Sequence, residues 1–182
     1  NLNNPWLGIL FGIIITIILQ SSSATTSLLV IFGQQGLINI QVALPIILGA
    51  NIGTTFTPFL ISLRGGINTK RSGLSNIIFK IIGALIVLPL IPYLLIILKS
   101  LTANTGQQVA NGHLLFNLFV TAIFFFLFKP FAKLIRKIIP GQEEMLPLWP
   151  EYINKKYLVT PKLALTAIHK ELARGSRIVK KM

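Results

Sequence analysis

The sequence predicts an all-α, polytopic membrane protein with re-entrant or discontinuous helices and a further helix at its C-terminal end. Three observations predict this fold class. Hydrophobic residues make up 53% of the 182 residues, and charged residues only 12%, about half the share found in an ordinary globular domain. The mean hydropathy is +0.74. Residues 1–142 combine nine Lys and Arg with no carboxylate side chain, because all four acids lie further on.

The first predicted element is an apolar segment over residues 5–19, shorter than the roughly 20 residues that a spanning helix needs. It runs into the sequence Gln-Ser-Ser-Ser-Ala-Thr-Thr-Ser at residues 20–27, in which seven of eight side chains are polar. Each unpaired polar group would cost several kcal/mol in hydrocarbon, so we expect this run to line a polar cavity. Broken helices of this kind expose backbone groups to solutes.

A second short apolar segment, residues 37–50, leads into the Gly, Asn and Thr cluster of residues 49–55, and residues 56–63 are apolar again. Two short segments that each end in a polar cluster predict a site formed by discontinuous helices. We therefore expect Gln20 and Ser21–Ser23 to form the turn of a re-entrant hairpin that faces Asn51–Thr55.

Two long apolar segments follow a basic loop at residues 64–71, and both can cross a membrane: residues 74–98, which Pro89 and Pro92 should kink or end early, and residues 109–128. Basic residues flank this pair on both sides, at residues 64–71 and 129–137, while the connector at 99–108 carries one charge. Two crossings return the chain to the face it left, so both basic segments should lie together on the cytoplasmic side and residues 102–107 outside.

Residues 141–159 read as a juxtamembrane linker, and Thr160-Pro161 as the start of a helix, with Thr as N-cap and Pro at the first helical position. Apolar residues recur there at helical spacing, and Lys and Arg occupy much of the remaining surface. Such a helix either packs against a partner helix or lies on anionic lipid.

Several classes of function are excluded by what the sequence lacks. It has no cysteine, no His or Cys at metal-ligand spacing, and no acid–base pair among residues 1–142, so we predict neither an enzyme nor catalytic residues nor a bound transition metal. The aromatic residues lie within apolar runs and not between basic ones, which argues against a nucleic-acid partner. Gly49 and Gly53 are spaced as in a close helix contact, and no Lys precedes Thr54 as a phosphate loop would require.

Three motifs, taken in order along the chain, resemble those of the type II sodium-dependent phosphate cotransporter family: Gln-Ser-Ser-Ser-Ala-Thr-Thr at 20–26, Gly-Ala-Asn-Ile-Gly-Thr-Thr at 49–55, and His-Leu-Leu-Phe-Asn at 113–117. The resemblance covers about residues 3–140. It implies that residues 1–140 are a transmembrane repeat, one half of an inverted repeat, and that residues 160–182 begin a PhoU-like cytoplasmic helical domain. The chain would then be a piece of a longer protein in the plasma membrane, whose partner is the first repeat or a second copy.

By this resemblance, the chain takes part in sodium-coupled symport of inorganic phosphate, with sodium as coupling ion, no other cofactor, and membrane lipid around it. The alternative is a membrane-anchored regulatory or scaffold protein that acts through the PhoU-like domain. The candidate residues for substrate and ion binding are Gln20, Ser21, Ser22, Ser23, Thr25, Thr26, Asn51, Thr54 and Thr55. Sodium is expected among the oxygens of Gln20, Ser21, Ser22, Ser23, Asn51 and Thr54. One or two of the three serines should instead bond back to the carbonyl four residues earlier.

Lys80, His113 and Asn117 are possible modulators of this site. Residues 72–80 can be laid over residues 109–117, so that Lys80 falls on Asn117, and Lys80 would lie about six residues inside a span. It either extends its side chain to the basic face or reaches the polar cavity, where its ammonium attracts phosphate or takes the place of a sodium ion. We expect His113, in a span's first turn, to be a hydrogen-bonded interfacial residue rather than a proton carrier.

Overall fold

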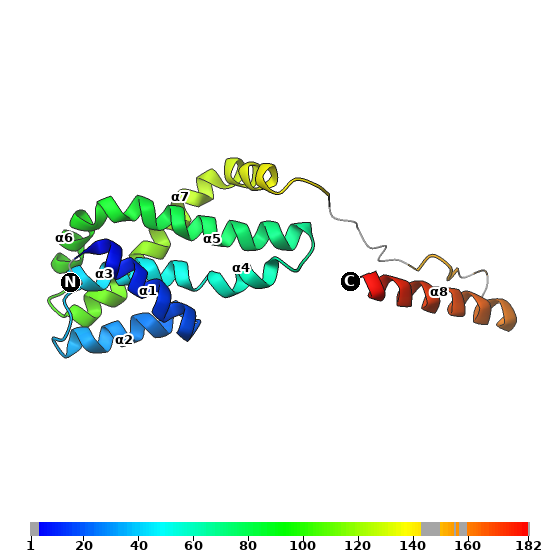
Figure 1. Cartoon of the computed structure of the whole chain (residues 1–182), viewed down its shortest axis with the longest axis horizontal. Helices are drawn as coiled ribbons and strands as arrows, with labels where there is room; N and C mark the ends of the chain where they lie inside the picture. The colour runs from blue at the N-terminus through cyan, green and yellow to red at the C-terminus, as the bar shows by residue number, and fades with distance from the viewer. Residues whose placement is uncertain (1–3, 143–149, 155, 157–159, 182) are drawn as a thin grey trace. The chain divides into compact units, whose positions relative to one another are not determined.

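The structure is a computed structural model that describes residues 4–142, 150–154, 156 and 160–181. These residues divide into two compact units, within residues 1–142 and 143–182. Every regular element among the described residues is helical, which confirms the predicted all-α class (Figure 1). The elements of the first unit are α1 (Pro5–Leu19), α2 (Ser22–Gln34), α3 (Ile40–Gly53), α4 (Phe56–Ser62), α5 (Ile67–Val87), η1 (Leu88–Leu90), α6 (Ile91–Leu101) and α7 (Thr105–Ile138).

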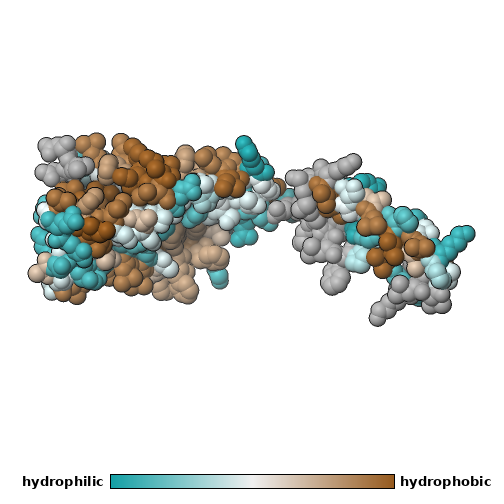
Figure 2. Space-filling view, turned by 90° about the horizontal axis from the view of Figure 1, so that it is seen from below, coloured by the Kyte–Doolittle hydropathy of each residue, from teal (hydrophilic) through white to brown (hydrophobic). Residues whose placement is uncertain are grey.

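Three stretches of this unit are long and apolar enough to cross a membrane: Ile40–Ser62, Ile67–Leu101 and Thr105–Ile138. Their lipid-compatible surface is extensive, because large apolar side chains such as Ile96, Leu118 and Phe126 are more than 60% exposed. Much of the visible face of this unit is accordingly brown in Figure 2. An exposed apolar surface of this extent is typical of a protein whose solvent is lipid.

Helix starts follow the polar residues of the sequence. Four helices begin after an Asn or Ser whose side chain accepts a hydrogen bond from a first-turn N–H, namely Asn4, Ser21, Asn39 and Asn104. These side chains satisfy donors that a helix leaves unpaired. Asn104 starts α7 four residues earlier than the apolar segment predicted, and α5 likewise begins at Ile67 rather than at residue 74.

The first helix break bends the chain sharply. The axes of α1 and α2 turn by 119° at Gln20–Ser21, where Gln20 adopts a left-handed conformation with φ 56°. Its backbone N–H donates to the Thr16 carbonyl at 2.7 Å, which closes the last turn of α1. The turn is shorter than predicted, because Ser22 and Ser23 already belong to α2.

The second break differs from the first. Thr54 and Thr55 separate α3 from α4, yet the two helices remain sufficiently aligned to count as one span of 23 residues. The expectation that this segment is too short to span is therefore wrong once α4 is added, since 23 helical residues extend over about 35 Å. In Figure 1 the turn between α1 and α2 lies beside this second break.

Helices α1 and α3 touch backbone to backbone. A Cβ atom added to Gly12 would overlap the Ile46 carbonyl oxygen, and one added to Gly49 would overlap that of Ile9. At Gly53 the same atom would lie 2.6 Å from the Ile13 carbonyl oxygen. The glycine spacing on α3 thus serves close helix packing, as its sequence predicts. This contact places the C-terminal end of α3 next to that of α1.

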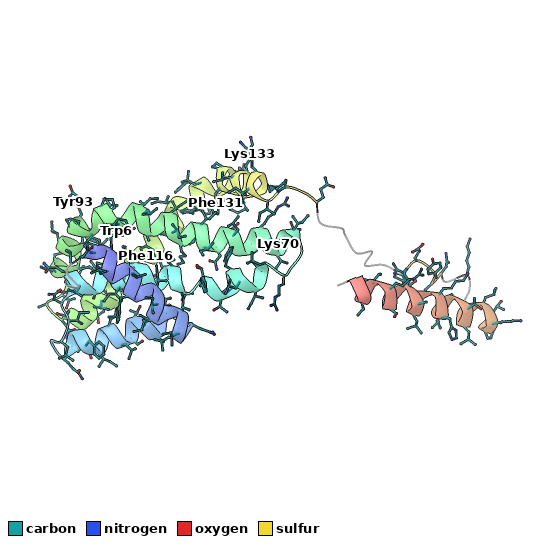
Figure 3. All side chains as sticks on the ribbon, viewed as in Figure 1. Trp6, Lys70, Tyr93, Phe116, Phe131 and Lys133 are labelled. Atoms are coloured by element: carbon teal, nitrogen blue, oxygen red, sulfur yellow. The ribbon has the colours of Figure 1, made fainter. Side chains whose placement is uncertain are left out.

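The two basic segments meet at one end of the first unit. The Arg71 guanidinium donates to the carbonyls of Ile139 and Gly141 at 3.1 and 2.7 Å, across the α5 and α7 segments. Figure 3 shows Lys70 and Lys133 toward this end and the exposed aromatic residues Trp6 and Tyr93 toward the other. Basic side chains gathered at one end of an apolar bundle are the charge asymmetry expected of a membrane protein.

The second unit consists of the residues near 150–154 and helix α8 (Pro161–Lys181). The Thr160 carbonyl accepts hydrogen bonds from Leu163 and Ala164, so the helix begins where Thr160-Pro161 predicts. The Arg174 guanidinium donates to the Glu171 carboxylate, and the backbone N–H groups of Tyr152 and Glu151 do so at 2.9 and 3.0 Å. Residues 143–149, 155 and 157–159 of the predicted linker lie outside the described residues.

Candidate functional site

The two polar clusters of the sequence are joined by a hydrogen bond. The backbone N–H of Ser22 donates to the Thr54 hydroxyl at 2.9 Å, over a separation of 32 residues. Ser21 begins α2, and its hydroxyl accepts from the Ala24 N–H at 3.2 Å. The N-terminal end of α2, which carries the positive end of the helix dipole, therefore lies at the break between α3 and α4.

Thr16 completes this neighbourhood, although sequence reasoning did not select it. Its side chain is fully buried, and its Oγ1 lies 2.7 Å from Oγ1 of Thr25, which joins α1 to α2 below the turn. Thr16 is the one polar side chain in the apolar run before Gln20. That isolation, four residues before a turn, is the signal that could have identified it.

The hydroxyls of the polar run divide into two groups. Thr25 and Thr26 bond back to the carbonyls of Ser21 and Ser22 at 3.2 and 2.8 Å, and both side chains are buried. The side-chain hydroxyls of Ser22 and Ser23 have no hydrogen-bond partner among the described residues, and Ser23 is exposed. The expectation that serines bond back to the helix is thus wrong, because the threonines fill that role and leave two serine hydroxyls available.

Gln20 and Thr55 take different positions from those two serines. Gln20 is exposed at the turn, and its side chain has no partner in the part of the chain that the structure describes. Thr55 is buried, and its hydroxyl donates to the Ile52 carbonyl at 2.6 Å, so it holds the α3–α4 break in shape. Of the nine candidates, Gln20, Ser22 and Ser23 therefore have side-chain polar atoms without a partner among the described residues. Ser21, Thr25, Thr26, Thr54 and Thr55 form hydrogen bonds at the two breaks, and the Asn51 side chain contacts Lys80 instead.

A second polar cluster joins α3, α5 and α7. The Lys80 Nζ donates to Oδ1 of Asn117 at 2.7 Å and to Oδ1 of Asn51 at 3.1 Å, so α5, α7 and α3 each contribute one side chain. Lys80 therefore turns inward, and the alternative in which it extends to the basic face is wrong for this structure. The register of three helices decides this contact, which a single sequence does not reveal.

His113 is placed differently from the prediction. It lies eight residues into α7, not in a first turn, because α7 begins at Thr105. Its backbone carbonyl accepts from Nδ2 of Asn117 at 2.9 Å, while its buried Nε2 has no partner among the described residues. It is thus an interior residue rather than the hydrogen-bonded interfacial one that we expected.

The described residues contain no group of three His, Cys, Asp or Glu side chains that could hold a metal ion. The polar atoms of both clusters are hydroxyl, amide and backbone groups, together with the one ammonium of Lys80. Neutral oxygens of this kind suit a hard monovalent cation, and hydroxyl and N–H donors suit an oxyanion. No carboxylate in residues 1–142 would repel that anion.

A family model described as Na+/Pi-cotransporter matches residues 1–129. The YqeW protein of Bacillus subtilis, whose name gives no activity, is 31% identical over 77% of this chain and 46% of its own length. YjbB of Escherichia coli K12, named for inorganic phosphate export, is 29% identical over 92% of this chain and 31% of its own length. Human sodium-dependent phosphate transport protein 2B is 42% identical over 34% of this chain and 9% of its own length. The chain thus spans less than half the length of these relatives, and no solved structure matches it.

Proposed function

The chain belongs to the Na+/Pi-cotransporter family, and on that premise we propose that it forms part of a secondary transporter that carries inorganic phosphate with sodium ions across the plasma membrane. The observation that carries this proposal is the Ser22–Thr54 hydrogen bond. It brings the break between α1 and α2 to the break between α3 and α4, within an apolar bundle. Paired helix breaks of this kind are how secondary transporters build a solute site near the membrane midplane.

The length of α1 and the sharp bend that follows it support a re-entrant hairpin. Helix α1 has 15 residues, which extend over about 22 Å and fall short of the roughly 30 Å of hydrocarbon. The bend of 119° then sends α2 back toward the end from which α1 came (Figure 1). We infer that Gln20 and Ser21 then lie within the hydrocarbon layer, where a polar turn requires a polar cavity.

Phosphate fits the N-terminal end of α2. The Ser23 N–H and the Ser22 and Ser23 hydroxyls are donors without a partner among the described residues, and they lie at the positive end of the helix dipole. Sodium fits the acceptors around the same turn, which are the Gln20 side-chain oxygen and the hydroxyls of Ser21 and Thr54. Thr25, Thr26 and Thr55 position these groups through their own hydrogen bonds.

Gln20 and Ser23 are exposed on the surface of the first unit, so an enclosed site needs another transmembrane segment to cover them. We propose the first repeat of an inverted pair, or a second copy of this chain, in that position. The basic end with Arg71 and Lys133 is then cytoplasmic, and so is residue 160 onward as the start of a PhoU-like domain.

The competing function, a membrane-anchored regulatory or scaffold protein, has its own supporting observation. On α8, Leu163, Ile168 and Leu172 are 44–66% exposed and form an apolar stripe that needs a partner. An anchor, however, has no use for a polar turn inside its apolar bundle. Transport therefore accounts for more of the first unit than anchoring does.

The test uses the natural full-length protein in proteoliposomes with radiolabelled phosphate. We expect phosphate to accumulate when sodium is higher outside, and reversal of the sodium gradient to reverse the flux. Ser22→Ala should lower uptake by roughly tenfold, which corresponds to about 1.4 kcal/mol of lost binding. Ser100→Ala is the matched control, since Ser100 lies at the far end of α6. Phosphate flux that does not depend on the sodium gradient would contradict sodium-coupled transport. The absence of any phosphate flux would favour the scaffold function.

A further inference from the structure

Lys80 lies within the apolar part of a helix that is long enough to span a membrane. It is six residues beyond the start of the apolar segment at residue 74, which corresponds to about 9 Å along the helix axis, and thirteen residues beyond the first residue of α5. A lysine at this depth is costly in a membrane protein and is retained for a reason of structure or function. Its side chain is half-buried, and its ammonium faces α3 and α7, the two helices that carry Asn51 and Asn117.

The two asparagines hold their oxygens toward one point. The Asn51 Nδ2 donates to the Ile47 carbonyl at 3.0 Å, and the Asn117 Nδ2 donates to the His113 carbonyl at 2.9 Å. Each amide is thus bonded to its own helix through its NH2 group, which leaves its oxygen facing inward. The Lys80 Nζ occupies the point where these oxygens converge, 3.1 and 2.7 Å away.

The surroundings of the ammonium stabilise its positive charge without a carboxylate. The rings of Phe79 and Phe116 have their centroids 5.5 and 5.7 Å from the Lys80 Nζ, within the range of a cation–π contact. Residues 1–142 hold no carboxylate that could pair with the ammonium. Asn51 also lies near the C-terminal end of α3, where the helix dipole is negative. Converging neutral oxygens at a helix C-terminal end are the environment of a bound alkali ion.

We propose that the Lys80 ammonium is a tethered cation that permanently fills a sodium site formed by the Asn51 and Asn117 side-chain oxygens. The effect of this site on ion coupling rests on the proposed transport function. The existence of the site does not, because sodium binding can be measured without transport. Without the ammonium, two amide oxygens would face each other across an unfilled polar space, which a sodium ion can neutralise. The chain then needs one sodium ion fewer per phosphate than the same protein without a lysine here.

The experiment measures sodium binding directly. The full-length protein is purified in detergent, and equilibrium binding of radioactive sodium is counted for the natural protein and for Lys80→Met, Lys80→Gln and Lys80→Arg. We expect the Met and Gln variants to bind one additional sodium ion per chain, and the Arg variant, which keeps the charge, to match the natural protein. Adding Asn117→Ala to Lys80→Met should abolish the gain, because it removes half of the site.

An unchanged sodium count in both Lys80→Met and Lys80→Gln, with each variant monodisperse on gel filtration, would overturn the proposal. A loss of phosphate binding without any gain of sodium would also overturn it, since it would assign the ammonium to the anion.

Phosphate flux is measured in parallel. The Met variant should show a steeper dependence of uptake on sodium concentration than the natural protein. If no form of the protein carries phosphate while the Met variant still gains a sodium ion, the transport function is wrong and the cation site stands. If all forms carry phosphate with the same sodium dependence and the same sodium count, the transport function stands and the cation site is wrong.

Discussion

The backbone N–H of Ser22 donates a hydrogen bond to the hydroxyl of Thr54, and this bond joins the break between α1 and α2 to the break between α3 and α4. A first-turn N–H of α2 that would otherwise be unpaired is satisfied by a side chain from the α3–α4 break. The two breaks are therefore one structural feature, and a change at either should affect the other.

Thr54→Val tests this coupling. It keeps the shape of the side chain but removes the acceptor, which leaves the Ser22 N–H without a partner and should lower the free energy of unfolding by about 1–3 kcal/mol. Thr54→Ser keeps the hydroxyl, so its free energy of unfolding should be close to that of the natural protein. The midpoint of thermal unfolding in detergent is the measurement. Equal midpoints for Val and Ser would mean that the hydrogen bond does not hold the two breaks together.

Gln20 allows backbone strain to be separated from side-chain function. A non-glycine residue in the left-handed region costs roughly 1–2 kcal/mol, so Gln20→Gly should stabilise the turn, whereas Gln20→Ala keeps the strain. Both variants lack the amide and should lose phosphate uptake if that amide binds an ion. A thermal midpoint that rises for Gly alone, with uptake lowered in both, is the expected pattern. Normal uptake in both variants would remove Gln20 from the site.

Gly49→Ala should disrupt the packing of α1 on α3. The added methyl group overlaps the Ile9 carbonyl oxygen, and backbone atoms have no rotamer by which to move aside. We expect a loss of about 1–3 kcal/mol of stability, measured by denaturant or thermal unfolding. Gly175→Ala in α8 is the matched control, because no atom lies within 4 Å of its added Cβ. That substitution should stabilise α8 by roughly 0.5–1 kcal/mol, and a similar loss at both sites would refute a packing role for Gly49.

The sidedness of the first unit can be tested by cysteine labelling, since the chain has no native cysteine. Ala103 lies in the connector that we predict to face outward, and it is a better labelling position than Asn104, whose side chain caps α7 and whose loss would cost roughly 1 kcal/mol. In intact cells an impermeant thiol reagent should label Ala103→Cys but not Ser176→Cys. Labelling of Ser176→Cys alone would reverse the orientation.

Glu171 gives the second unit a pH dependence. The Arg174 guanidinium, followed by the Tyr152 N–H, lowers the pKa of the Glu171 carboxyl below its ordinary value. These contacts therefore stabilise the folded unit above the ordinary glutamate pKa of about 4.3, and their contribution is lost as the pH falls through the lowered pKa. Hydrogen exchange of the Glu151 and Tyr152 amides should lose protection over that range. Glu171→Gln should show weaker protection at neutral pH and no such pH dependence.

The sequence was sufficient to predict the limits of those helices that end where polar residues begin. The apolar run over residues 5–19 coincides with α1, because Gln20 follows it directly and Asn4 caps its start. The sequence was not sufficient to predict where α5 and α7 begin, because both helices extend beyond their apolar parts into polar turns. Backbone hydrogen bonding continues a helix past the edge of the hydrocarbon, so hydropathy marks the lipid layer rather than the helix.

The candidate site was predicted at the level of clusters but not of contacts. Two short apolar segments that each end in a polar cluster predicted that Gln20–Ser23 faces Asn51–Thr55, and the Ser22–Thr54 hydrogen bond joins these clusters. The inward turn of Lys80 was left open, because it depends on the register of α3 and α7 against α5. A single sequence carries no information on that register.

The close packing of α1 on α3 also bears on the order in which this unit is assembled. The glycine-bearing face of α1 has its partner only once residues 45–53 have been synthesised, and α1 alone, at about 22 Å, is too short to span the bilayer. If α1 and α2 form the re-entrant hairpin that we propose, α1 can therefore reach its final position only after α3 has entered the bilayer. A later helix would then provide the binding surface for an earlier one during membrane insertion.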